Sequence, residues 1–326
     1  MTMLQYEIES WPLKEAFSFA GHTVEALEAI HVTLKRDGYM GHGEGLTPIV
    51  FPITIEDMEA EIKAATQAIM QGRDVAEVCA AMRAGPARNA LDSALWDLRA
   101  KESGKSIWQL AGLPEGPAAI EVDQTIGLGV PEDMARQAQE SIHRVLKVKM
   151  DDKAIAPRLK AVREACPNSE LIIDANQSWS VEILMNHADL LEALDIKMVE
   201  QPVKPADDRQ LEGLAFPIPI FADESCHVSA DVDRLKGMYQ GVNIKLDKTG
   251  GLTEALALAR AARQAGMGVM VGCMSGTSLS MAPAYVIASL SDWSDLDGPL
   301  QLQSDRTPAM RYNRGHLSHP DPALWG

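Results

Sequence analysis

The feature that most constrains this chain is the alternation of short apolar runs with helix-like segments through its C-terminal part. Eight such runs occur between residues 120 and 302. Runs such as Leu171-Ile172-Ile173 are apolar on successive residues, which is typical of parallel strands covered on both faces. The pattern therefore predicts an α/β fold with a parallel sheet. The expected strands are 120–128, 145–150, 171–175, 198–201, 218–222, 241–246, 268–274 and a last short run near 295–302.

The polar residues at the ends of these runs favour one α/β architecture over another. They are, in order, Thr125, Lys149, Asp174, Glu200, Asp223, Lys245, Cys273 and Asp297, at intervals of 24, 25, 26, 23, 22, 28 and 24 residues. An interval of one strand plus one helix places each residue on a different strand, at the same level. In a (β/α) barrel the carboxyl ends of all strands open on one face, where active sites form. A doubly wound sheet gives no reason for this regularity, so we predict a barrel.

Three of these strand-end residues are carboxylates on successive strands, Asp174, Glu200 and Asp223. Like charges at one site raise one another's pKa unless a cation neutralises them. Hard oxygen ligands without Cys or His indicate Mg²⁺, with Mn²⁺ or Ca²⁺ as weaker alternatives. We therefore predict a metal site, which Asn176 and Glu224 could support from outside.

Lysines predict the reaction class. Lys147 and Lys149 are two residues apart, so they point to the same face of one strand. Nearby positive charge lowers the pKa of a lysine and makes a neutral amine available as a base. Lys245 lies on a later strand, which would put it nearly across the barrel mouth. Two bases flanking a metal-bound substrate suit proton abstraction next to a carboxylate, through an enediolate, and so racemisation or epimerisation.

The first part of the chain has a different pattern. Segments 4–11 and 29–34 alternate as strands do, and the glycine-rich run 41–45 predicts a turn with a structural role. Apolar residues at helical spacing predict helices at 56–70, 74–82 and 86–101. Pro114, Gly116 and Pro117 then interrupt the chain, and we place the domain boundary there.

Composition excludes several classes of protein. With 30 Lys+Arg and 46 Asp+Glu, the formal charge of −16 argues against binding to nucleic acid or to an acidic membrane. The four cysteines form no CxxC pair, which favours a reducing compartment. Acidic residues interrupt the N-terminal stretch, and no run reaches the roughly 18 apolar residues of a membrane span. We expect a cytoplasmic protein with a small-molecule substrate, and a homo-oligomer is compatible with the sequence.

Eight motifs in this order resemble the enolase superfamily, muconate-lactonizing subgroup, and within it the dipeptide epimerases of the L-Ala-D/L-Glu epimerase type. The motifs cover almost the whole chain. They are ARNALDSALWDL at 87–98, LKVK at 146–149, DAN at 174–176, VEQP at 199–202, ADES at 222–225, NIKLDKTGG at 243–251, GCM at 272–274 and DLDGP at 295–299.

The resemblance implies an enolase-like α/β fold, a modified TIM barrel (β/α)₇β at 116–303 under an α+β capping domain at 1–115, to which segment 304–326 returns. It also implies roles for residues. Mg²⁺ would be held by Asp174, Glu200 and Asp223 and would bind the substrate carboxylate. Lys149 and Lys245 would be the acid/base pair, for the L- and D-epimer respectively, and Lys147 would neutralise the enediolate. Asp295 and Asp297 would bind the free ammonium group of a dipeptide, and Thr125 and Cys273 would line the substrate.

One segment departs from the family pattern. Glutamate-specific relatives carry arginine in a loop of the cap that corresponds here to 17–25, FSFAGHTVE, which has neither Arg nor Lys. Loss of such a partner for a buried carboxylate costs on the order of 2–5 kcal/mol. Phe17, Phe19 and Val24 instead suggest an apolar or small second residue in the substrate, and His22 leaves a partly polar option.

Dipeptide epimerisation at the C-terminal residue of L-Ala-Xaa is the first functional hypothesis. An N-acylamino acid racemase, o-succinylbenzoate synthase or muconate cycloisomerase is the alternative, although their substrates lack the ammonium group that Asp295 and Asp297 would bind. A non-catalytic scaffold would not need the two lysines. Acid-sugar dehydratases commonly use a His/Asp pair, whereas no histidine occurs here between His227 and His316.

Overall fold

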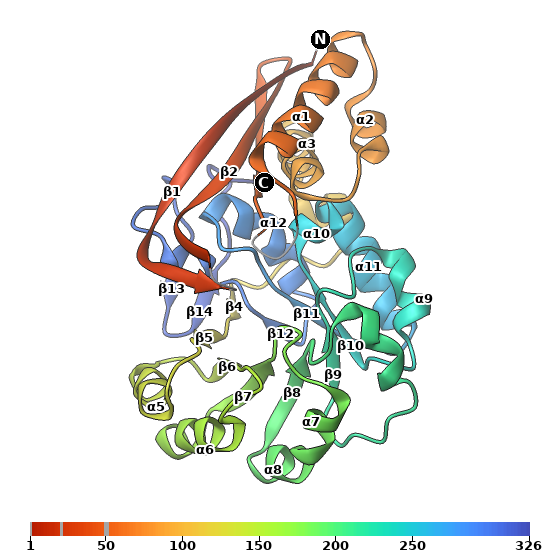
Figure 1. Cartoon of the computed structure of the whole chain (residues 1–326). Helices are drawn as coiled ribbons and strands as arrows, with labels where there is room; N and C mark the ends of the chain where they lie inside the picture. The colour runs from red at the N-terminus through yellow and green to blue at the C-terminus, as the bar shows by residue number, and fades with distance from the viewer. Residues whose placement is uncertain (1, 20–21, 49–51) are drawn as a thin grey trace.

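The larger part of the molecule is an eight-stranded parallel sheet that curls into a barrel (Figure 1). The computed structural model describes residues 2–19, 22–48 and 52–326, and the side chains of 16–19 and 22–24 lie outside this description. Neighbouring strands follow chain order, and the edge strands β5 and β12 meet where Asp123 N donates to Ser294 O at 2.9 Å. The barrel strands are β5 Gln124–Ile126, β6 Val145–Lys149, β7 Glu170–Asp174, β8 Ile196–Glu200, β9 Ile220–Ala222, β10 Gly241–Ile244, β11 Gly268–Val271 and β12 Trp293–Ser294. The predicted (β/α)₇β architecture is confirmed.

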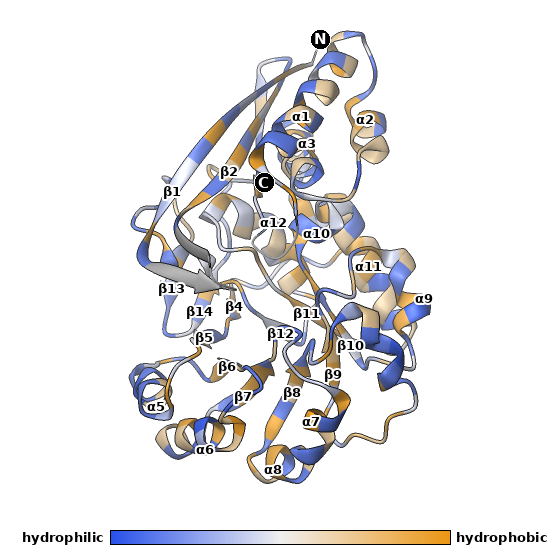
Figure 2. Cartoon of the chain, viewed as in Figure 1, coloured by the Kyte–Doolittle hydropathy of each residue, from blue (hydrophilic) through white to orange (hydrophobic). Residues whose placement is uncertain are grey.

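The connections between these strands carry helices, and Figure 2 shows hydrophobic residues on the strands inside them. The link from β8 to β9 is the exception, because it contains a 3₁₀ helix, η1 Pro205–Leu211. No helix of the described chain is long and apolar enough to cross a bilayer. The other helices are α5 Pro131–Glu140, α6 Ile155–Ala165, α7 Val181–Asn186, α8 Ala188–Ala193, η2 Ser229–Asp231, α9 Val232–Leu235, α10 Leu246–Thr249, α11 Leu252–Gln264 and α12 Ser278–Ala288.

One predicted barrel strand was too long and another was misplaced. Segment 120–128 splits into β4 Ala119–Glu121 and β5, because β4 pairs with β14 His316–Ser318 in a small separate sheet with β13 Tyr312–Asn313. The strand pairing changes at Asp123, whose N–H donates to Ser294 O of β12. The last barrel strand lies before 295–302, and that segment is a loop followed by the 3₁₀ helix η3 Gly298–Gln301. Pro299, which lacks an N–H donor, sits in this helix rather than in a ladder.

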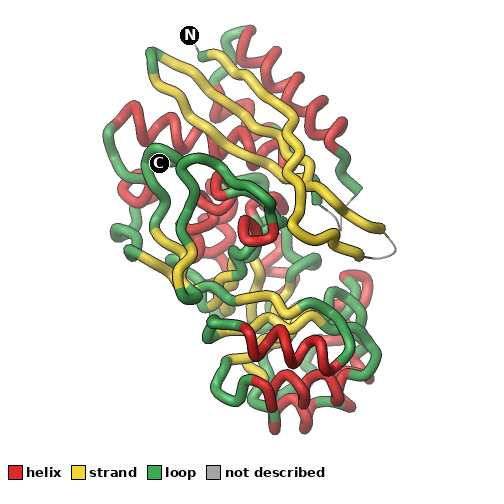
Figure 3. Tube along the Cα trace, turned by 90° about the vertical axis from the view of Figure 1, so that its left-hand side faces the viewer, coloured by secondary structure: helices red, strands yellow, loops and turns green. Residues whose placement is uncertain are grey.

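The cap packs a three-stranded antiparallel sheet on helices. Figure 3 shows its long strands side by side, and the predicted helices agree with the observed ones to within a few residues. A separate hydrophobic core joins this sheet to α1, α2 and α3. The elements are β1 Met3–Phe19, β2 His22–Arg36, β3 Tyr39–Leu46, α1 Ile55–Met70, α2 Val75–Ala81, α3 Pro86–Ser103 and α4 Ile107–Ala111.

The glycine-rich run at 41–45 is part of strand β3, and the predicted turn was wrong. Gly41, Gly43 and Gly45 alternate along the strand, so all three face the same way. A Cβ on Gly43 would lie 2.1 Å from Ala90 O and 2.6 Å from Ala94 N of α3. The glycines are there because the helix lies directly on the strand, a contact between segments that a local pattern does not reveal.

Polar residues of α3 dock the cap onto the barrel. Asn89 Nδ2 donates to Asp247 Oδ1 at 2.9 Å, which also accepts from Leu46 N at 3.2 Å. Asp92 accepts from Thr253 N at 2.9 Å and from Thr253 Oγ1 at 2.6 Å, so a cap residue satisfies the first turn of barrel helix α11. The family-like motif at 87–98 thus joins two units of structure.

The C-terminal segment returns to the cap. Arg306 Nη1 donates to Glu9 Oε1 at 2.9 Å and its Nη2 to Glu44 Oε2 at 2.6 Å, both in the cap sheet. Gly326 N donates to Asp97 Oδ1 of α3 at 2.8 Å. We keep the predicted boundaries of 1–115, 116–303 and 304–326 as a proposal that these contacts support.

Candidate active site

The charged residues lie one layer above a hydrophobic floor inside the barrel. That floor packs Val145, Ile172, Met198, Phe221 and Met270 from five strands. Because side chains alternate along a strand, the residues two positions further on face the same interior. They are Lys147, Asp174, Glu200, Asp223 and Gly272. Lys149, Asp174 and Glu200 pair in register across β6, β7 and β8.

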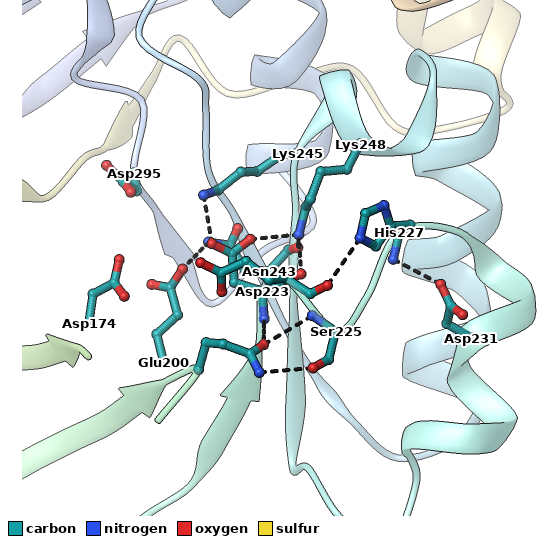
Figure 4. A network of polar contacts seen from close by, with 12 residues as sticks. Asp174, Glu200, Asp223, Ser225, His227, Asp231, Asn243, Lys245, Lys248 and Asp295 are labelled. Atoms are coloured by element: carbon teal, nitrogen blue, oxygen red, sulfur yellow. Dashed lines mark hydrogen bonds and ion pairs between the residues drawn. The ribbon is translucent and has the colours of Figure 1, made fainter. Parts of the chain in front are cut away.

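Asp174, Glu200 and Asp223 converge on this interior and are each at most 2% exposed (Figure 4). Burial raises the pKa of Asp174, but Lys149 and Lys147 outweigh it and lower that pKa to about 2. Lys245 and Lys248 likewise overcome burial and hold the pKa of Asp223 well below its usual range. Burial and then Asp174 raise the pKa of Glu200 to about 7. Three carboxylates are thus held together, and Glu200 is the one whose negative charge the neighbouring lysines neutralise least.

The donor set fits a hard divalent cation. Among the described residues, Glu200 Oε2 is buried and accepts no well-aligned hydrogen bond, although Lys147 Nζ lies 2.8 Å away. Glu224 Oε2, next to Asp223 in the chain, is likewise buried and has no hydrogen-bond partner in the part of the chain that the structure describes. Carboxylate oxygens with no thiol or imidazole among them are the ligands that Mg²⁺ prefers.

The three lysines of the prediction surround these carboxylates. Lys147, 1% exposed, places Nζ 2.6 Å from Asp295 Oδ2 and 3.2 Å from Asp174 Oδ2. Lys149 Nζ donates to Asp174 Oδ2 at 2.7 Å. Lys245 Nζ donates to Asp223 Oδ2 at 2.7 Å. Strands β6 and β10, which carry or precede these lysines, are separated by three strands, so Lys149 and Lys245 lie on opposite sides of the eight-stranded barrel.

The electrostatics of the lysines differ from the expectation of a lowered pKa. Burial lowers the pKa of Lys147, but Asp295, Glu200 and Asp174 reverse this and raise it well above the usual range. Asp223 does the same for Lys245. The sequence argument rested on the positive charge of a bound cation, whereas these pKa shifts come from burial and the protein's own charges, chiefly the carboxylates.

The remaining predicted residues lie on β5 and in the loops after β11 and β12. Thr125 pairs in register with Lys147, and its N–H donates to Asp297 Oδ2 at 3.2 Å. Burial and then Asp295 raise the pKa of Asp297 to about 6. Burial, followed by Asp295 and Asp297, raises the pKa of the Cys273 thiol. The structure therefore brings Thr125, Cys273, Asp295 and Asp297 to one side of the pocket.

The side chains of the 17–24 part of the predicted specificity loop lie outside the described residues. The backbone places Phe17 opposite Val24 and Phe19 opposite His22, across the hairpin of β1 and β2.

Sequence reasoning missed four polar residues of this region. Lys248 Nζ donates to Asp223 Oδ1 at 2.6 Å, and Asn243 Nδ2 donates to Glu200 Oε1 at 2.6 Å. Gln201 Oε1 accepts from Asp223 N, and Asp123 is 1% exposed and close enough to Lys147 and Asp295 for their charges to act on it. Asn243, Lys248 and Gln201 lie inside motifs that carried the family resemblance, but their partners come from other strands.

Two cavities lie at the opposite end of the barrel. The larger, of about 320 Å³, is lined by Arg144, Arg163, Glu170 and Lys197, which lie at or near the amino ends of β6, β7 and β8. Active sites of barrels form at the carboxyl ends. We therefore assign the site to the charged cluster and not to these cavities.

A (β/α)₇β barrel with three carboxylates and facing lysines under an α+β cap defines an enolase-like protein. Residues 2–112 match the family model for the mandelate racemase / muconate lactonizing enzyme N-terminal domain, and residues 131–323 match the model described as enolase C-terminal domain-like. The chain belongs to the mandelate racemase / muconate lactonizing enzyme family of the enolase superfamily.

Similar proteins in this family include amino acid and dipeptide epimerases and racemases. The L-Ala-D/L-Glu epimerase of Escherichia coli (strain K12) is 40% identical over 95% of this chain and 97% of its own length. The N-acetyl-D-glutamate racemase of a Pseudoalteromonas species is 37% identical over 91% of this chain and 95% of its own. The dipeptide epimerase of Enterococcus faecalis V583, solved with Mg and L-Leu-L-Tyr, superposes with a TM-score of 0.89 at 28% identity, covering 98% of this chain and 97% of that one.

Proposed function

We propose that this protein is a Mg²⁺-dependent dipeptide epimerase, an isomerase that moves the α-proton of the C-terminal residue of L-Ala-Xaa-type dipeptides. The observation that carries the proposal is the pair Lys149 and Lys245 on opposite sides of the barrel, with three buried carboxylates between them. Such a pair can remove a proton from one face of a carbon and return it to the other.

Each polar group of the pocket then has a role. Asp174, Glu200 and Asp223 would hold Mg²⁺, or Mn²⁺ in its place, which supplies positive charge to bind the substrate carboxylate and stabilise the enediolate. Lys149 would take the α-proton of the L-epimer and Lys245 that of the D-epimer. Lys147, buried between Asp174, Glu200 and Asp295, would add a fixed positive charge where the enediolate develops.

Asp295 and Asp297 support a dipeptide over an N-acylated amino acid. Both are 7% exposed, burial and then Asp295 raise the pKa of Asp297, and within the described part of the chain Asp297 forms no ion pair. A substrate ammonium group would supply a cationic partner. Thr125 holds Asp297 through its N–H, and Cys273 lies near both carboxylates.

N-acylamino acid racemisation is the second candidate, since one relative at 37% identity is an N-acetyl-D-glutamate racemase. The absence of Arg and Lys from 17–25 suggests that the second residue of the substrate is apolar or small and not glutamate. Four unpaired cysteines support a cytoplasmic location, and assembly into a homo-oligomer is compatible with this function.

The test is a panel of L-Ala-L-Xaa dipeptides and N-acetyl amino acids, incubated with Mg²⁺ and followed by chiral chromatography, with EDTA as control. We expect epimerised dipeptides, with Ala-Phe or Ala-Ala turned over at higher kcat/KM than Ala-Glu. Asp297→Asn should lower kcat/KM for dipeptides and leave any activity on N-acetyl substrates unchanged. A preference for Ala-Glu would overturn the specificity, and turnover of N-acetyl substrates alone would favour the second candidate.

A further inference from the structure

We infer that Gln201 is a positioning residue that fixes the relative placement of Asp174, Glu200 and Asp223, and through it the affinity of the site for a divalent cation. The inference rests on the proposed metal site. Gln201 itself is 0% exposed, so it would act through the three carboxylates.

Gln201 is linked to all three carboxylate-bearing segments, to two by hydrogen bonds and to the third through the chain. Its side-chain Oε1 accepts from Asp223 N at 2.8 Å and from Ser225 N at 3.1 Å (Figure 4 draws the bonds at Ser225 and Asp223). Its backbone O accepts at 2.8 Å from Gln177 N, three residues beyond Asp174. Glu200 precedes it directly in the chain. One residue thus ties together the ends of β7, β8 and β9.

The other end of the Gln201 amide fixes which way it points. Nε2 donates to Val203 O at 2.9 Å, to Ser225 Oγ at 2.8 Å and to Tyr239 OH at 3.0 Å. Ser225 Oγ and Tyr239 OH both donate to Asp208 Oδ1, at 2.8 and 2.6 Å, so they must accept from Gln201. Turning the amide over would set its NH₂ group against two backbone N–H donors, so Oε1 is committed to Asp223.

The backbone of Gln201 is also held in an unfavourable conformation. Its φ is +34°, in the left-handed backbone region that residues other than glycine rarely adopt. Such strain persists where surrounding bonds over-determine it and gathers at functional sites. The strained residue Gln201 follows Glu200 immediately. The hydrogen bonds that hold Gln201 in this conformation therefore also help to orient Glu200 at the end of β8.

The placement of the three carboxylates matters for the binding of a cation such as Mg²⁺. Mg²⁺ demands near-octahedral geometry at 2.0–2.1 Å, so small shifts of a carboxylate weaken binding. Changes to groups that orient metal ligands typically cost 10–100-fold in metal affinity. A glutamine that served packing alone would affect stability but not this affinity.

The experiment compares Gln201→Met, which keeps the length and removes the hydrogen bonds, with Tyr239→Phe. The second variant removes one buried partner of Nε2 and leaves the Oε1 bonds to Asp223 and Ser225 in place. Isothermal titration of the full-length, EDTA-treated proteins with MgCl₂ gives Kd, and thermal denaturation gives the stability change. If Gln201→Met fails to fold, Gln201→Asn takes its place, because it keeps the amide but shortens its reach.

We expect Gln201→Met or Gln201→Asn to weaken Mg²⁺ binding 10–100-fold and Tyr239→Phe to change it less than about threefold. Wild-type affinity in the Gln201 variant would overturn the inference. Equal loss of affinity in Tyr239→Phe would also overturn it, because the network as a whole would then be responsible. A wild-type protein that binds Mg²⁺ but epimerises no dipeptide would refute the proposed function and leave the role of Gln201 intact. A wild-type protein that binds no Mg²⁺ would overturn both.

Discussion

Gly43→Ala tests the close contact between strand β3 and helix α3. The new Cβ would lie 2.1 Å from Ala90 O and 2.6 Å from Ala94 N. Ordinary carbon–oxygen contact begins at about 3.3 Å, so strand and helix must separate by roughly 1 Å. A gap of about 0.5–1 Å forfeits a quarter to a half of the dispersion energy of the atom pairs across it. Overpacking costs about 1–3 kcal/mol, and rigid helix backbone as the neighbour puts this variant at the upper end, about 3 kcal/mol.

The assay is urea denaturation of Gly43→Ala beside Gly129→Ala. At Gly129 a Cβ would meet Met134 Cγ at 3.7 Å, an ordinary contact, so we expect a change within about 0.5 kcal/mol. The sheet that β3 belongs to also carries the hairpin with residues 17–25, so KM for the dipeptide should rise in the first variant alone. Equal midpoints for the two variants would refute the packing argument.

Two further predictions concern the docking of the cap on the barrel. Asp92→Ala removes the acceptor of both Thr253 hydrogen bonds and should lower the free energy of unfolding by about 2–3 kcal/mol. Asp92→Asn should lower it less. Equal losses for the two variants in urea denaturation would contradict the capping role. Burial raises the pKa of Asp247 to about 7 against the hydrogen bonds from Asn89 and Leu46, and Glu44 adds to the rise. The folded state therefore keeps a proton that the unfolded chain releases near pH 4, so the stability from this group falls as pH rises from about 4 to about 7. Asp247→Asn should gain roughly 2–4 kcal/mol relative to wild type between pH 5 and 8, and a difference independent of pH would contradict this.

The strand ends that meet in the pocket were predictable because each signal is local. A charged residue after an apolar run, repeated at intervals of one strand plus one helix, marks the carboxyl end of a barrel strand wherever the strand lies. The two-residue period likewise placed Lys147 and Lys149 on one face. The structure brings these residues together, and their catalytic roles stay predictions.

What the sequence did not reveal depends on contacts between distant segments. Glycines at 41–45 favour a turn locally, and their place in a strand follows from α3 lying on them. Strand β4 separates from β5 because the C-terminal hairpin pairs with it. Gln201 and Lys248 are ordinary residues within their motifs, and their importance is visible through bonds to Asp223 on another strand.

Solvent exchange tests the two-base account most directly. Wild type, Lys149→Ala and Lys245→Ala, each loaded with Mg²⁺ in D₂O, are given a pool of L-Ala-L-Xaa dipeptides and the matching L,D pool, and mass spectrometry reads deuterium at the α-carbon. We predict that wild type exchanges both pools in an EDTA-sensitive reaction, that Lys149→Ala loses exchange of the L,L pool and that Lys245→Ala loses exchange of the L,D pool. Exchange of the L,L pool at the wild-type rate by Lys149→Ala, or no exchange of any free-amine dipeptide by wild type, would contradict the account.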